Sequence, residues 1–221
     1  MFLLPVLALR TLNAYRDNSA VSSLIPEKDL ASFRLAHRAL RTFCLRKGIF
    51  GSRFGYLSSM ELTIMLLRVL IRQHFSVISA SSLFQGFFAT YVSLDWGSGE
   101  VTIPGFSSST AIPSKISPMT ILSIHKPQRN LTENVVHPTL SEISLQFAAA
   151  ASVNGAGLWR TIFQEDTSLE PADQFLRSYP RFIRVRIHYW GRDARKGFSL
   201  VGYTESQLTW VGPKQSSLLG F

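Results

Sequence analysis

The sequence predicts an α+β protein, with a mostly helical domain over residues 1–157 and a partial α/β segment over residues 158–221. Two observations predict this class. In successive stretches between residues 30 and 92, apolar residues recur at the three- and four-residue spacing of amphipathic helices. Between residues 181 and 190 the period changes to two, which is the spacing of a half-buried strand.

The first predicted helix covers residues 30–47 and is basic. Pro26, followed by Glu27 and Asp29, is typical of a helix entry, because acidic side chains are favourable near the positive N-terminal end. Gly48 and Gly51 are expected to end the helix and allow a turn. Residues 1–29 before it are mixed, with an apolar start and a polar stretch over residues 13–23. The apolar residues at helical spacing are Leu30, Phe33, Ala36, Leu40, Phe43 and Cys44.

Further helices are expected along the chain. A wide apolar face predicts one over residues 60–75, and an almost continuous aromatic surface predicts a buried one over residues 79–92. Residues 95–118 hold many glycines, prolines and serines, so they are expected to form an irregular excursion. After Pro138, residues 139–142 fit a capping box, which predicts a helix from Thr139 to about Ala151.

The C-terminal segment is basic and is expected to be incomplete. One face of the predicted strand over residues 181–190 is apolar and the other carries Arg184, Arg186 and His188. A short helix is predicted over residues 200–211. Because one strand and one helix cannot bury a core alone, we expect this domain to be cut short at Phe221.

Composition favours a folded chain with an anionic partner. Hydrophobic residues make up 46% of the 221 residues and aromatic residues 12%, which is ample material for a core. The net charge of +9 favours nucleic acid, nucleotide phosphates or an acidic membrane surface as partners. The single cysteine, Cys44, excludes an internal disulfide, and its place in an apolar helical pattern predicts that it is buried. A reducing, intracellular compartment fits this cysteine usage.

The apolar N-terminus resembles neither a membrane span nor a good secretory signal. No Lys or Arg precedes the apolar stretch, and Pro5 interrupts it. Elsewhere no run approaches the roughly 18 apolar residues needed to cross a bilayer. We therefore expect no membrane partner.

Most catalytic constellations are absent from the sequence. The five histidines are scattered, with no His-x-x-x-His or Cys-x-x-Cys spacing for a metal. No Gly-x-Ser-x-Gly elbow and no phosphate-cradling glycine loop occurs. Adjacent Glu165 and Asp166 would face apart on a strand, so they do not form the spaced carboxylate pair of two-metal phosphoryl transfer.

The remaining candidate is the end of the basic helix with the turn that follows it. Arg and Lys neutralise phosphates, and Phe50 can stack on a base. The alternative is a solvated helix face with Phe50 and Phe54 in the core. The residues concerned are Arg41, Arg46, Lys47, Phe50, Ser52, Arg53 and Phe54.

Residues 33–62, FRLAHRALRTFCLRKGIFGSRFGYLSSMEL, carry a family resemblance. This run closely resembles the central-domain signature of eukaryotic poly(A) polymerases: a Phe-Arg-x-x-x-Arg-Ala-x-Lys helix, an Arg-Arg-Gly-x-Tyr-x-Asn turn and a Phe-Gly-Phe-x-Gly-Gly-Val segment. Residues 10–13 resemble the family's Arg-Ser-Leu-Asn, and residues 119–134 its Met-Pro-Ile-x-Thr-Pro stretch. Residues 196–208 resemble the Leu-Val-Glu-Ser helix of its RNA-binding domain. The similar segments run in the family's order over most of the chain.

The resemblance implies a function and a set of contacts. The family adds AMP from ATP to RNA 3′ ends in the nucleus, with Mg²⁺ or Mn²⁺ and with polyadenylation-factor proteins as partners. It implies a helical central domain followed by part of an RRM-like (ferredoxin-like) RNA-binding domain. The implied RNA contacts are Arg184, Arg186, Arg195 and Lys196. The implied nucleotide contacts are Asn13, Arg41, Phe50, Ser52 and Met60, the last in the segment Ser58–Ser59–Met60.

Several implied contacts depart from the family pattern. Arg41 replaces a Lys, Phe50 a Tyr, Ser52 an Asn, and Ser58 and Ser59 two glycines, so weakened ATP binding or a degenerate copy is expected. Met1 lies near the point where the family's nucleotidyltransferase domain would end. We therefore expect this chain to supply nucleotide- and RNA-binding parts and to be inactive alone. The alternatives are a non-catalytic RNA- or protein-binding scaffold and an unstable remnant.

Overall fold

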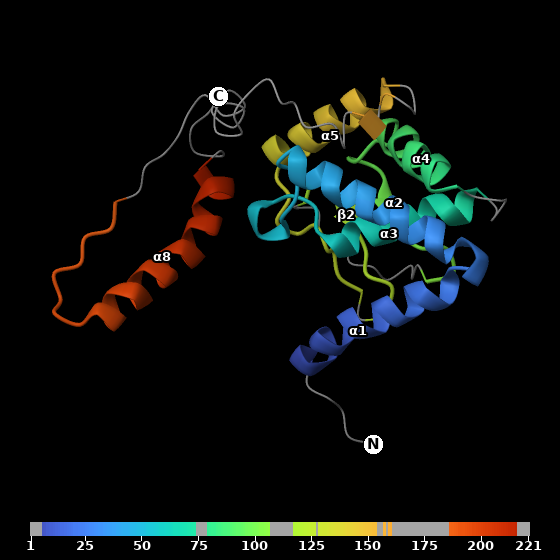
Figure 1. Cartoon of the computed structure of the whole chain (residues 1–221). Helices are drawn as coiled ribbons and strands as arrows, with labels where there is room; N and C mark the ends of the chain where they lie inside the picture. Colours follow the sequence, from blue (N-terminus) through green and yellow to red (C-terminus); the bar gives the residue numbers. More distant parts are fainter. Residues whose placement is uncertain are drawn as a thin grey trace, which may run out of the picture. The chain divides into compact units, whose positions relative to one another are not determined.

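A computed structural model describes residues 6–73, 79–106, 117–126, 128–153, 157, 159, 160 and 186–215. The chain divides into two compact units, residues 1–162 and residues 163–221. The first unit is mostly helical with a small parallel sheet, which confirms the α+β class (Figure 1). Among the described residues, no helix is both long enough and apolar enough to span a membrane.

The first helix, α1 (Val6–Leu24), falls in a region where the sequence predicted no element. Its buried residues include Asn13, Asp17 and Val21, which lie four positions apart on one face. Because two of these three are polar, the buried face of α1 is hidden from a search for apolar periodicity. In Figure 1, α1 runs along one side of the first unit.

The basic helix, α2 (Glu27–Arg46), begins after Pro26 as expected and ends before a turn that contains Gly48. Its buried face includes Phe33, Leu40 and Cys44, and burial raises the pKa of the Cys44 thiol to about 12. Cys44 is therefore an unreactive core residue, as predicted. The exposed side of α2 carries its arginines, among them Arg34, Arg38 and Arg41.

Two further helices pack with α2 around an aromatic core, α3 (Ser59–Arg72) and α4 (Ala80–Val92). The predicted end of α3 at residue 75 falls outside the described residues. Ser79 is the N-cap of α4, and its side chain accepts a hydrogen bond from the Ser82 amide. The Tyr91 hydroxyl donates to the Met65 carbonyl at 2.8 Å, which satisfies a polar group inside the core.

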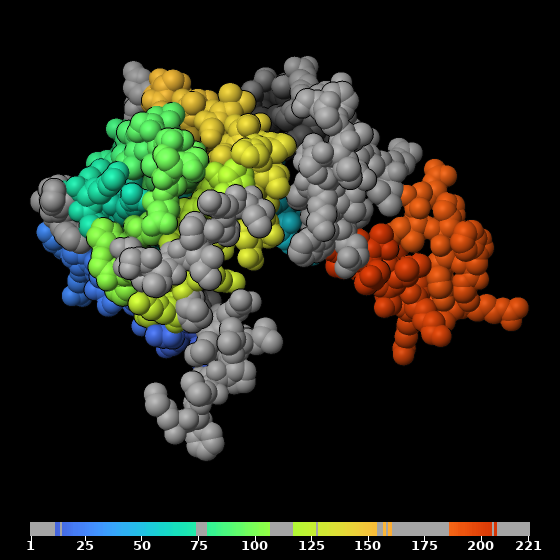
Figure 2. All heavy atoms as spheres, turned by 180° about the vertical axis from the view of Figure 1, so that it is seen from behind, coloured from blue at the N-terminus to red at the C-terminus, as the bar shows by residue number. Residues whose placement is uncertain are grey.

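The helix α5 (His137–Ala151) closes the core against α4, and Figure 2 shows these two helices side by side at the surface of the first unit. It begins two residues before the predicted start. Thr139 is not the cap itself; it lies one turn inside, and its hydroxyl accepts a hydrogen bond from the Val136 amide at 3.0 Å. Phe147 of α5 meets Phe88 of α4 with ring centroids 5.6 Å apart.

Two short parallel strands lie in the segment between α4 and α5, and both contact α3. The strands β1 (Glu100–Val101) and β2 (Thr120–Ile121) pair in register, with Val101 opposite Ile121. The irregular excursion predicted over residues 95–118 thus contains a strand, and residues 107–116 lie outside the described residues. Arg68 of α3 donates to the Glu100 carbonyl at 2.7 Å, which fixes β1 on the helices.

In the second unit, the described residues include one long helix, α8 (Ala194–Gln215). The predicted helix over residues 200–211 is confirmed and is longer than expected. Residues 186–190 form no strand, so the strand prediction is wrong for this part, and residues 181–185 lie outside the described residues. The RRM-like identity of this unit stays a prediction.

Candidate functional site

A tight turn between α2 and α3 forms one wall of the candidate site. The Gly51 amide donates to the Leu57 carbonyl at 2.7 Å, and Phe50 and Leu57 form an isolated bridge. Gly51 and Gly55 both have positive φ, which favours glycine. A Cβ on Gly55 would lie 2.8 Å from the Asn134 carbonyl oxygen, so the turn approaches the loop before α5 too closely for any other residue.

The start of α3 is fixed by a capping interaction beside this turn. The Ser58 amide donates to Oε2 of Glu61 at 3.0 Å, and the Ser58 hydroxyl donates to the same oxygen. Glu61 is only 3% exposed. Ser58 was singled out from the sequence without its partner, although Ser-x-x-Glu is a recognisable capping signature.

A pocket of about 210 Å³ lies between α1, this turn, α3 and the loop before α5. Its lining combines carboxylates, amides, hydroxyls and one guanidinium, so it offers both donors and acceptors. The volume is below the usual range of roughly 300–1,000 Å³ for drug-sized ligands, so it fits a part of a ligand such as one polar ring. The lining residues are Asn13, Asp17, Ser52, Ser58, Met60, Glu61, Arg129, Asn130, Leu131, Glu133 and Asn134.

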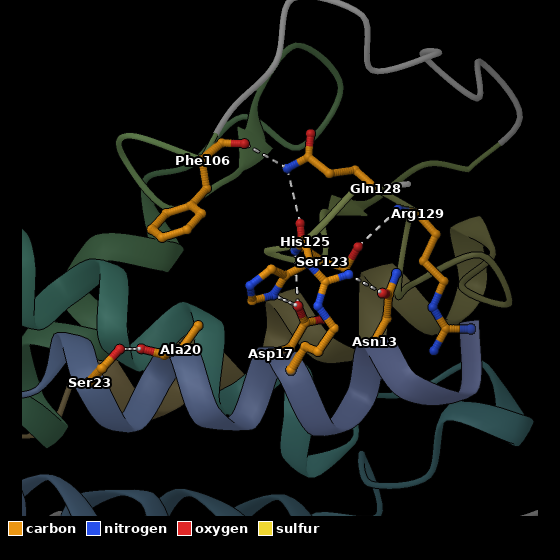
Figure 3. A network of polar contacts seen from close by, with 10 residues as sticks. Asn13, Asp17, Ala20, Ser23, Phe106, Ser123, His125, Gln128 and Arg129 are labelled. Carbon is orange, nitrogen blue, oxygen red and sulfur yellow. Dashed lines mark hydrogen bonds and ion pairs between the residues drawn. The ribbon is translucent and has the colours of Figure 1, made fainter. Parts of the chain in front are cut away.

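Polar contacts attach α1 to the loop that lines the pocket (Figure 3). Asp17 is 2% exposed, and its Oδ1 accepts from the His125 amide at 2.9 Å and lies 2.8 Å from Nδ1 of the same histidine. The Arg129 amide donates to the Ser123 hydroxyl oxygen, and Gln128 donates to the Phe106 and Ser123 carbonyls. Asp17 and the loop therefore hold each other in place.

The same loop is also closed on itself by two side chains. Asn130 Oδ1 accepts from the Ile121 amide at 3.1 Å, and its Nδ2 donates to the Met119 carbonyl at 3.1 Å. The Thr132 hydroxyl donates to the same carbonyl at 2.8 Å. Side chains thus satisfy the Ile121 amide and the Met119 carbonyl.

Burial shifts the pKa values of two groups near the turn, Glu61 and His37. Burial raises the pKa of Glu61, while the hydrogen bonds from Ser58 and the positive charge of Arg129 act against this shift. Burial lowers the pKa of His37, and the neighbouring charge of Arg41 lowers it further. His37 Nε2 lies 3.2 Å from the Ser59 carbonyl and 3.1 Å from the Thr63 hydroxyl, so it links α2 to α3.

The five predicted nucleotide contacts fall into two groups. Asn13, Ser52 and Met60 line the pocket together, although Asn13 is far from the others in the sequence. Arg41 and Phe50 do not line it; the Arg41 guanidinium lies over the Phe50 ring, 5.5 Å from its centroid. The alternative that Phe50 and Phe54 are both core residues is wrong, because Phe54 is 57% exposed.

The four predicted RNA contacts belong to the second unit. Arg186, Arg195 and Lys196 are exposed, and Arg184 lies outside the described residues. Trp190 and Phe198 near them are 89% and 78% exposed. His188 stacks on Trp190 with ring centroids 5.9 Å apart.

Several pocket residues were missed by sequence reasoning. Asp17, Glu61 and Asn134 are polar residues with no motif spacing between them, and Arg129 was only part of a general basic excess. Two signals were available: Ser-x-x-Glu at the start of α3, and an Asn before α5 that the family resemblance had already included. The described residues contain no group of three side chains that could hold a metal ion, so they do not fit a Mg²⁺ or Mn²⁺ site.

The comparisons with known proteins bear on both units. No protein-family model matches the chain. The chain is similar to a poly(A) polymerase of Dictyostelium discoideum, with 23% identity over 216 residues. The matched region covers 92% of this chain and 25% of the relative, so the chain spans about a quarter of that protein's length. The similarity therefore suggests a poly(A) polymerase-related family.

Proposed function

We propose that this chain is the nucleotide- and RNA-binding part of a poly(A) polymerase-like protein, a family that adds AMP from ATP to RNA 3′ ends. One observation carries the proposal. Of the five nucleotide contacts that the family resemblance implies, three line one pocket, namely Asn13, Ser52 and Met60. The similarity to a poly(A) polymerase over most of the chain supports the same assignment.

In this proposal the pocket takes a part of the nucleoside of ATP, and positively charged side chains near the pocket bind the phosphates. Amides and hydroxyls of Asn13, Ser52 and Asn134 supply hydrogen bonds, and Met60 supplies an apolar contact. Arg41 and Phe50 form a second contact area at the end of α2. When bound, Mg²⁺ or Mn²⁺ would neutralise charge on the phosphates, with ligands from outside the described residues.

ATP titration in the presence of Mg²⁺, followed by calorimetry on the whole chain, tests the nucleotide part. We expect saturable binding that weakens about tenfold or more in Arg41→Ala, because this variant removes a guanidinium that pairs with a phosphate. Arg34→Ala is the matched control, since it removes another exposed arginine from the same helix. A folded chain that binds no ATP would contradict this part of the proposal.

The second unit supports RNA binding. Exposed basic residues next to exposed aromatic rings combine phosphate neutralisation with base stacking, which is how single strands are bound without a fixed sequence. Replacing Arg186, Arg195 and Lys196 together by alanine should weaken binding to a single-stranded RNA. The slope of log affinity against log salt should decrease by about one for each phosphate that the protein no longer neutralises. Arg160→Ala in the first unit is the control.

The alternative function is a non-catalytic scaffold that binds RNA or a polyadenylation-factor protein, and RNA binding without ATP binding would favour it. The prediction that the chain adds no AMP by itself is checked by incubating it with ATP, Mn²⁺ and a labelled RNA oligonucleotide. Extension of the oligonucleotide would contradict that prediction. A nuclear location is part of the proposal, and imaging of the tagged full chain in cells tests it.

A further inference from the structure

The first unit places a buried carboxylate in the wall of the pocket. Glu61 is 3% exposed and lines the pocket together with Ser52, Ser58 and Met60. Removing a carboxylate from water costs free energy unless hydrogen bonds within the protein replace those to water. Ser58 satisfies this one twice, because both its amide and its hydroxyl donate to Oε2.

The contact with Ser58 fixes the turn as well as the helix. Leu57, the residue before Ser58, accepts a hydrogen bond from the Gly51 amide at 2.7 Å, and its own amide donates to the Ile49 carbonyl. Ser52 directly follows Gly51. A displacement of Ser58 therefore moves Leu57, then Gly51, and with it the pocket residue Ser52.

The opposite side of the turn is held by the loop before α5. The Asn134 amide group donates to the Ser52 carbonyl at 3.2 Å. Gly55 lies against the Asn134 backbone, with no room for a Cβ. Asn134 thus holds one side of the turn, and Glu61 holds the other side through Ser58.

We propose that Glu61 is a positioning residue, which holds Ser58 and the turn over residues 51–58 so that Ser52 and Met60 form the nucleotide-binding wall. This inference rests on the proposed nucleotide site, and the role it assigns to Glu61 is to hold the wall of that site in place. In this role Glu61 acts as a hydrogen-bond acceptor. The side-chain amide oxygen of a glutamine can accept the same two bonds, so Glu61→Gln should keep the function.

The test compares Glu61→Ala, Glu61→Gln, Ser58→Ala and the double variant Ser58→Ala/Glu61→Ala in the whole chain. Calorimetry measures the affinity for ATP with Mg²⁺, and circular dichroism establishes that each variant is folded. We expect about a tenfold loss of affinity in Glu61→Ala and a loss below about threefold in Glu61→Gln. The double variant should be no worse than Glu61→Ala, since the two residues act through one contact.

A purely structural role gives a different result. Helix capping alone would lower the unfolding midpoint of Glu61→Ala and leave the ATP affinity of the folded chain at the wild-type value, which would overturn the proposal. An equal loss in Glu61→Gln would also overturn it, because the charge rather than the hydrogen bonds would then matter. Glu142→Ala is the matched control: this carboxylate accepts from Gln146 on α5 and lies outside the pocket.

Amide hydrogen exchange without any nucleotide separates this inference from the proposed function. Glu61→Ala should exchange faster over residues 51–58, while residues 83–91 of α4 keep wild-type rates. If the wild-type chain is folded and binds no ATP, the proposed function fails, yet faster exchange in the turn would still support the positioning role. Unchanged exchange over residues 51–58 would overturn it.

Discussion

The core and the pocket of the first unit are held together by different kinds of contact. Around α4, aromatic rings pack edge to face, with Phe88 touching Phe43, Phe84, Phe87 and Phe147. Around the pocket, hydrogen bonds replace apolar packing: Asp17, Glu61 and Asn130 accept from backbone amides, and Asn134 donates to the Ser52 carbonyl. The core contributes most of the stability, and the polar contacts determine where the pocket groups lie.

The largest expected effect is on the core side of this comparison. Phe88→Ala removes a ring that is 1% exposed, which should cost about 3–5 kcal/mol of unfolding free energy. Urea denaturation followed by circular dichroism measures this cost. If the core does not determine where the pocket groups lie, the folded fraction of Phe88→Ala should bind ATP with wild-type affinity. A loss of ATP affinity in the folded fraction would contradict this separation of core and pocket.

Replacement of Gly55 tests the pocket side. Gly55→Ala places a Cβ 2.8 Å from the Asn134 carbonyl at a positive φ, which should cost roughly 1–3 kcal/mol and weaken ATP binding. Gly105→Ala is a matched control, because Gly105 also has a positive φ and no atom within 4 Å of the added Cβ. An equal loss of unfolding free energy in Gly55→Ala and Gly105→Ala would mean that backbone strain is responsible, and not the close approach of the Cβ to Asn134.

Asp17→Asn tests the attachment of α1. It removes the charge from a buried carboxylate that accepts from the His125 amide, so we expect a loss of about 1–3 kcal/mol in the unfolding free energy. Proton NMR of the His125 ring reports the change in its contact with Asp17, and urea denaturation measures the loss of stability. If the His125 signals and the stability both stayed at wild-type values, Asp17 would not hold the loop.

The smallest effect is the pH dependence that Glu61 contributes. Because burial raises its folded-state pKa, its contribution to stability is fully present below the unfolded pKa and is lost as the pH rises through the folded pKa. The stability of the wild type relative to Glu61→Gln should therefore fall as the pH rises above the usual glutamate pKa of about 4.3. Taking this difference cancels the opposite contribution of His37, whose pKa is lowered. A flat difference would contradict the shift.

The two regions also differ in how well the sequence predicts them. Helices α2, α3 and α4 follow from apolar spacing and glycine signals, because burial of a continuous apolar face leaves a periodic pattern. The helix α1 was missed, because Asn13 and Asp17 occupy its buried face. Asn13 and Met60 were predicted only through the family resemblance, and only the resemblance grouped them with Ser52, since no local pattern shows that distant residues share a pocket.

The contact between Asp17 and His125 joins residues that are 108 positions apart in the chain. Contacts between α2, α3 and α4 join segments that follow one another in the sequence. Closing a long segment of chain costs more conformational entropy than closing a short one, and such contacts form slowly. The helices should therefore assemble first during folding, and the pocket last. Pulse-labelled hydrogen exchange during refolding should show protection in α3 and α4 before the His125 amide becomes protected.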